Sequence, residues 1–156
     1  LVGSEMCIRD RLDQDLADLS AAYQQSKTEL KATEKRLKDV NHQLRLLGQY
    51  FKTKTVYREY IKGGRRKDFA AAHRSELELY DAVAKELREL FGDQKLPSVH
   101  SLKQEKAQLA VCKEAQYESY SELRTQWVEL SKLARNRDSI AGQAMQSERN
   151  SKKLTI

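Results

Sequence analysis

A repeat of apolar residues in the first third of the chain constrains the fold more than any other feature. From Leu12 to Phe51, apolar or small side chains recur at steps of four and three residues, with an average of 3.5. Such a repeat, held over more than five heptads, is typical of a helix that packs along another helix in a coiled coil. The members of the repeat are Leu12, Leu16, Leu19, Tyr23, Ser26, Leu30, Thr33, Leu37, Val40, Leu44, Leu47 and Phe51.

Glycines and charges predict where the helices end. Acids near residue 13 and cations near residue 60 complement the dipole of a helix over residues 12–62. The pair Gly63-Gly64 supplies the backbone freedom that a helix C-terminus commonly uses. An apolar stripe then predicts a second helix over residues 67–91, which Gly92 ends.

A third helix is expected over residues 98–140, because Ser98 and Ser101 are suitable N-caps. The connector before it is short and contains the only proline, Pro97, which favours antiparallel neighbours. The predicted fold class is all-α, with three long helices in an up-down-up, antiparallel, coiled-coil-like arrangement. Residues 12–144 form the helical domain, and residues 145–156 are expected to be a flexible basic tail.

The helix lengths predict an uncovered apolar surface. The second helix is about half as long as the first and can cover only residues 37–62 of it. The stripe from Leu12 to Leu30 is then expected to lack a partner within the chain. An exposed stripe of this length would be buried by a second copy of the chain or by a preceding segment.

Residues 1–11 are set aside from these arguments. Their sequence, LVGSEMCIRDR, resembles the translation of a transposase-based sequencing adapter, and we interpret it as adapter-derived. Cys112 is then the only cysteine, which suits a reducing cytoplasm. No stretch approaches eighteen apolar residues, so the sequence predicts no membrane span.

Positive charge is concentrated around the first predicted turn. Residues 45–67 contain eight Lys or Arg and a single acid, Glu59, whereas the whole chain carries a net charge of +6. Such a cluster predicts contact with a nucleic acid or another acidic partner. The alternative is that these cations only solvate the flank of a coiled coil. The candidate residues are Lys52, Lys54, Arg58, Lys62, Arg65, Arg66 and Lys67. The helix lengths also place Lys132, Arg135 and Arg137 at the same end.

Catalytic groupings are not found in the sequence. His42, His73 and His100 are isolated, without the paired spacing of a zinc site, so no metal, cofactor or catalytic residue is predicted. Most tyrosines lie at helical spacings and are interpreted as packing residues. Tyr57 and Tyr60 lie among the cations, and single-stranded nucleic acid is bound by such mixtures of aromatic and basic side chains.

Four stretches between Tyr50 and Tyr120 also resemble a known family. They are Y-x6-Y-x2-Y from Tyr50, F-x3-H-x2-E-L-x-L-Y from Phe69, K-L-P-S-V-x-S-L from Lys95, and the set Glu105, Leu109, Tyr117 and Tyr120. Together they resemble the C-terminal helical region of relaxases, the mobilisation nucleases of conjugative transposons and plasmids of the gut Firmicutes type. The resemblance implies a non-catalytic segment that helps to hold DNA or partner proteins, while the nicking tyrosine and histidine cluster lie in a preceding domain. The alternative is a structural coiled-coil spacer or dimerisation module without nucleic-acid contact.

Overall fold

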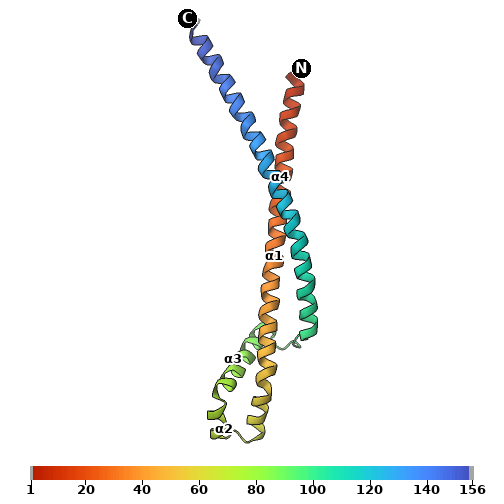
Figure 1. The fold of residues 1–156 in the computed structure, drawn as a ribbon, viewed down its shortest axis with the longest axis vertical. Coiled ribbons are helices and arrows are strands. Elements are labelled where there is room, and N and C mark those ends of the chain that lie inside the picture. The colour runs from red at the N-terminus through yellow and green to blue at the C-terminus, as the bar shows by residue number, and fades with distance from the viewer. Residues whose placement is uncertain (1, 155–156) are drawn as a thin grey trace. The chain divides into compact units, whose positions relative to one another are not determined.

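The computed structural model describes the backbone of residues 2–154 and the side chains of residues 8–154. It contains four helices, drawn in Figure 1: α1 (Val2–Lys62), α2 (Lys67–Ala72), α3 (Arg74–Phe91) and α4 (Val99–Leu154). No strand occurs among the described residues. The all-α class is confirmed. The single helix expected over residues 67–91 is divided into α2 and α3 at His73, whose φ of −115° interrupts the helix.

The two ends of the chain differ from the expected boundaries. Helix α1 begins at Val2, ahead of residue 12, although the side chains of residues 1–7 lie outside the description. Helix α4 runs past residue 140 to Leu154, so the tail expected to be flexible is helical as far as the structure describes it. Residues such as Gln, Ala, Met, Glu and Lys, which favour helices, dominate this stretch and allow the helix to continue.

The chain divides into two compact units. The hairpin unit comprises residues 33–112, and the paired-helix unit comprises the residues up to 32 and those from 113 onward. Both units contain part of α1 and part of α4.

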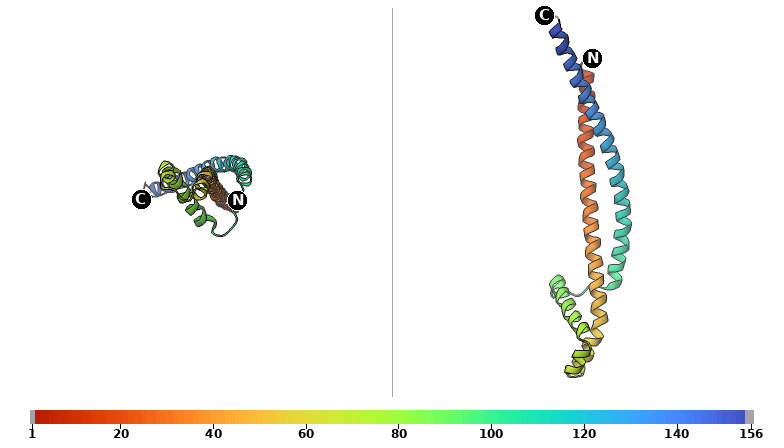
Figure 2. Two further views of the ribbon diagram at one scale, coloured as in Figure 1. Left: turned by 90° about the horizontal axis from the view of Figure 1, so that it is seen from below. Right: turned by 60° about the vertical axis from the view of Figure 1, so that its left-hand side comes forward.

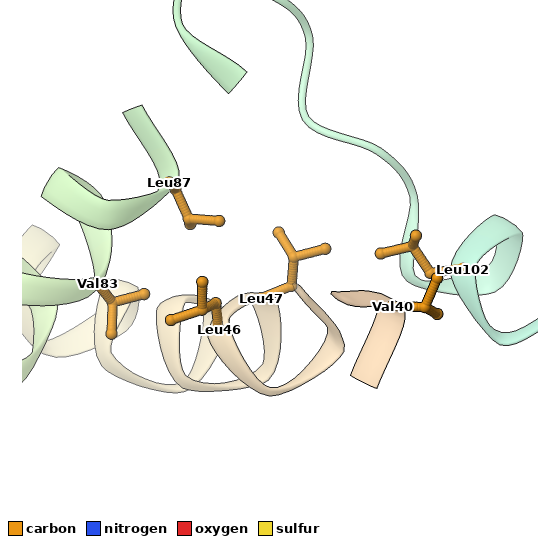
Figure 3. Close-up of a cluster of buried hydrophobic side chains, with 6 residues drawn as sticks. All are labelled: Val40, Leu46, Leu47, Val83, Leu87 and Leu102. Atoms are coloured by element: carbon orange, nitrogen blue, oxygen red, sulfur yellow. The ribbon is translucent and has the colours of Figure 1, made fainter. Parts of the chain in front are cut away.

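The core of the hairpin unit lies where α1 meets α3 and the start of α4. Figure 3 shows its six buried side chains: Val40, Leu46, Leu47, Val83, Leu87 and Leu102. Leu47 and Val40 are fully buried. Tyr50, Phe91, Leu96 and Leu109 are among the partly buried side chains that pack around this cluster.

Both partner helices run antiparallel to α1 in the hairpin unit. Rings of Tyr57 and Tyr80 stack, and further back along α1 His42 contacts Glu86, which sets the direction of α3. Figures 1 and 2 show α3 alongside the last part of α1. In the first turn of α4, Leu102 lies beside Val40 (Figure 3), and three residues later Glu105 contacts Arg36.

The contacts therefore differ from the expected up-down-up order, since α3 and α4 run in the same direction. Burial explains the difference. If the third helix turned back along α3, it would lie beside residues of α1 that α3 already covers. Helix α4 instead runs along the apolar stripe of α1 that precedes Val40 and buries that stripe.

In the paired-helix unit, α4 covers the stripe that was expected to be exposed. The ring of Tyr23 stacks on Tyr120 and on Trp127, with centroid distances of 5.4 and 5.6 Å. Leu30 on α1 and Ala134 on α4 are buried, each only 8% exposed. The prediction that the Leu12–Leu30 stripe lacks a partner within the chain is therefore wrong.

Candidate nucleic-acid interface

A helix-ending motif turns the chain directly after α1. Gly64 has a φ of 75°, and its N–H donates to the carbonyl oxygen of Ile61 at 3.2 Å. The N–H of Arg65 donates to the carbonyl oxygen of Tyr60 at 3.0 Å. These two bonds form a Schellman motif, which satisfies the last carbonyl groups of a helix and needs a left-handed residue.

Stacked rings hold α2 and α3 against the end of α1. Tyr57 stacks on Tyr80 with ring centroids 4.1 Å apart, and Tyr60 stacks on Phe69 at 6.2 Å. The imidazole of His73, which separates α2 from α3, lies 4.4 Å from the Phe69 ring. Helix α2 contains no buried residue, so these rings position the turn.

We call the seven predicted phosphate-binding side chains the basic tip. All belong to the hairpin unit, on the last turns of α1 and on the turn into α2. Six are exposed, and Lys54 is half-buried, with its Nζ over the ring of Tyr50 at 5.4 Å. Among the described side chains, none of the seven forms an ion pair. The members are Lys52, Lys54, Arg58, Lys62, Arg65, Arg66 and Lys67.

Two other arginines of the hairpin unit do form ion pairs, in contrast to the arginines of the basic tip. Arg36 forms a two-bond contact with Glu105 at 2.6 and 3.0 Å, and Arg74 forms an ion pair with Glu78 at 2.8 Å. These contacts raise the pKa of both arginines, chiefly through the hydrogen bonds to the carboxylates.

The net charge lies in one unit. Residues 33–112 contain 17 Lys or Arg and 11 Asp or Glu, a net charge of +6. The rest of the chain contains 12 of each and is neutral. Any long-range attraction for a polyanion therefore originates in the hairpin unit.

The second basic group belongs to the other unit. Arg137 lies in the paired-helix unit and contacts Asp13 at 2.9 Å. The hydrogen bonds to Asp13 and Asp138 raise the pKa of Arg137. Lys132 and Arg135 belong to the paired-helix unit as well.

The two tyrosines proposed as base-stacking residues are occupied within the fold. Tyr57 and Tyr60 are partly buried and stack on Tyr80 and Phe69. The exposed aromatic residue of this region is Phe51, 50% exposed, which the heptad repeat had placed in the apolar seam. The apolar seam of α1 packs against α4 at Arg36 and Val40 and against α3 further along the helix. The sequence contains no signal for this change of partner, so it could not show that Phe51 lies outside the contact.

Groups with catalytic potential are dispersed. No cluster of three His, Cys, Asp or Glu that could hold a metal ion exists among the described residues. His42 contacts Glu86 at 2.6 Å and Arg45 at 3.0 Å, so the ring bridges two charged side chains. Because arginine only donates, Nδ1 of His42 accepts and Nε2 donates to Glu86.

A cavity of about 210 Å³ is lined by residues of α1, α3 and the following connector. Tyr50, Tyr80, Leu87 and Arg88 are among its lining residues. Burial and the neighbouring Tyr50 raise the pKa of Tyr80 to about 12, which keeps its phenol protonated at neutral pH.

No protein-family model, curated protein or solved structure matches this chain. Among the described residues, no helix is long and apolar enough to cross a membrane. The conclusions on function consequently depend on the geometry and charge of the basic tip.

Proposed function

We propose that this chain is a non-catalytic DNA-binding segment that holds DNA through phosphate contacts of its basic tip. One observation carries the proposal: seven cations follow one another along the last turns of α1 and the turn into α2, almost all are exposed, and none has an acidic partner among the described side chains, while Arg36, Arg74 and Arg137 are paired. Cations without intramolecular partners can release counterions from a polyanion, which is the main source of non-specific affinity.

The stacked tyrosines favour phosphate contacts over base contacts. Because Tyr57 and Tyr60 stack on Tyr80 and Phe69, one face of each ring is engaged within the fold. Binding through the cations alone carries no sequence information. We therefore expect similar affinities for duplexes of different sequence.

The family resemblance extends this proposal to a biological setting. We propose that the segment follows the nuclease domain of a conjugative relaxase, in a plasmid or conjugative transposon, and helps to retain DNA during transfer. Determining the gene sequence upstream of the Leu12 codon tests this part. A nuclease domain with a histidine cluster is expected there, and an unrelated domain would remove the relaxase assignment while leaving the DNA-binding proposal intact.

A salt titration of DNA binding tests the phosphate contacts. If all seven cations contact phosphates of a duplex, log K falls with log salt at a slope of about −6. Affinity then drops roughly 10³–10⁵-fold between 50 and 200 mM salt. Replacing Arg65, Arg66 and Lys67 by alanine reduces the steepness by about 2.7.

The matched control neutralises three cations elsewhere in the hairpin unit. Lys95, Lys103 and Lys106 are exposed and lie outside the basic tip. Their replacement by alanine changes the net charge equally, and we expect it to leave the slope nearly unchanged. Equal slopes for the two triple variants would show that binding follows net charge rather than the basic tip, and absence of binding by the unmodified chain at low salt would end the proposal.

A further inference from the structure

Arg65 has a backbone conformation that its residue type does not favour. Its φ is 59°, and among residues 2–154 it is the only residue other than glycine with a positive φ. The Schellman motif requires the left-handed region at Gly64, and Arg65 follows in the same region while its N–H bonds to Tyr60. A side chain with a Cβ is disfavoured there, whereas glycine adopts the conformation readily.

The folded chain does not compensate for this conformation. The side chain of Arg65 is exposed and forms no hydrogen bond or ion pair with the described side chains. Glycine already occupies the two preceding positions, so a third would extend the same turn with less strain. Disfavoured backbone conformations that bring no intramolecular gain occur preferentially where a side chain serves binding or catalysis.

The chemistry of the side chain indicates its ligand. A guanidinium presents a planar fork that donates two parallel hydrogen bonds to one phosphate, whereas an ammonium acts as a point charge. Arg65 lies between Lys62 and Arg66 in the basic tip, where electrostatic attraction brings a polyanion close.

We propose that Arg65 is the principal phosphate-binding residue of the basic tip, forming a two-bond contact with one phosphodiester, while its neighbours act mainly through charge. This inference rests on the proposed DNA binding and names the residue that determines its strength.

Charge-conserving substitutions separate the two kinds of contact. Arg65→Lys keeps the charge, so the salt slope stays the same, but one of two charge-assisted bonds is lost and affinity falls about tenfold. Arg66→Lys is the matched control, and its affinity changes less than about twofold because a point charge suffices there. Both variants are titrated with the same duplex at two salt concentrations.

Arg65→Gly adds a readout that a simple charge does not affect. Removing the side chain relieves the backbone, so the thermal unfolding midpoint rises, while the affinity falls and the salt slope weakens by about 1. A lower midpoint would show that Arg65 stabilises the fold and would overturn the inference.

The remaining outcomes are also decisive. Equal affinities for Arg65→Lys and Arg66→Lys would reduce Arg65 to one charge among seven, and the inference would fail while the proposed function stands. Failure of the unmodified chain to bind DNA would remove both the inference and the proposed function. The binding of the unmodified chain is therefore measured before any variant is compared.

Discussion

Replacing Tyr57 by alanine tests whether the tyrosines beside the basic tip hold the hairpin unit together or stack on bases. The ring of Tyr57 is partly buried and lies 4.1 Å from that of Tyr80, with an interplanar angle of 15°. Removing about 100 Å² of buried ring surface costs about 2.5 kcal/mol at 25 cal/mol per Å². Loss of the stacked pair adds about 0.5–1.5 kcal/mol.

The expected loss of unfolding free energy is therefore about 3 kcal/mol. If the unfolding free energy depends on urea with a slope of about 2 kcal/mol per molar, the midpoint of urea unfolding falls by about 1.5 M. Circular dichroism of the helices measures this midpoint. Phe51→Ala serves as the control, because Phe51 is 50% exposed and its truncation costs less than half as much. The affinity of folded Tyr57→Ala for DNA, measured well below its unfolding transition, stays within about twofold of the affinity of the unmodified chain.

The opposite pattern would refute this reasoning. Stacking on a base contributes about 1–3 kcal/mol per base, so a base-stacking Tyr57 would lose roughly 5- to 150-fold in affinity for a single strand. Such a loss without a change in stability would show that Tyr57 leaves Tyr80 to bind nucleic acid.

Three further predictions concern the stability of the hairpin unit. Leu47→Ala removes a fully buried side chain and lowers the unfolding free energy, measured by urea titration, by about 3 kcal/mol. Its control, Leu90→Ala, lies at a 49% exposed position and lowers the unfolding free energy by less than about 1 kcal/mol. The folded state raises the pKa of Tyr80 from 10.0 to about 12, so it favours the neutral phenol. The resulting stability is complete below pH 10 and is lost as the pH rises through 12. The thermal unfolding midpoint of Tyr80→Phe should therefore fall less steeply between about pH 9 and 12 than that of the unmodified chain. Gly64→Ala lowers stability by about 1–2 kcal/mol because its φ is 75°, whereas Gly48→Ala, inside α1 with open space around it, raises stability by about 1 kcal/mol.

The elements of the fold followed from local rules that the sequence displays. The glycines after Lys62 and Phe91 end their helices as expected, and the heptad repeat identified the face of α1 that packs. A heptad repeat does not specify which helix covers that face, because any apolar stripe of the same period fits. The direction of α4 depends on contacts such as Asp13 with Arg137, 124 residues apart.

Polar residues in the seam of α4 hid its partner. Lys113 and Gln116 are partly buried at positions that continue the spacing of Leu109 and Tyr120. Long polar side chains can bury their aliphatic portions and keep the polar ends near solvent. A search for apolar residues alone therefore underestimates how far α4 can pair with α1.

The direction of α4 also explains why the charge of the basic tip stays unpaired. Arg36 and Arg137 lie where α1 and α4 face each other, and each finds a carboxylate on the facing helix, Glu105 and Asp13 respectively. The part of α1 that carries the basic tip pairs through its rings with α2 and α3, and its other side, which includes Lys52 and Arg58, is exposed. A cation on a face without a neighbouring helix keeps its charge available to solvent ions, and a polyanion can replace those ions. An arginine added to the seam would be neutralised as Arg36 is, so the proposed DNA binding depends on the location of the cations more than on their number.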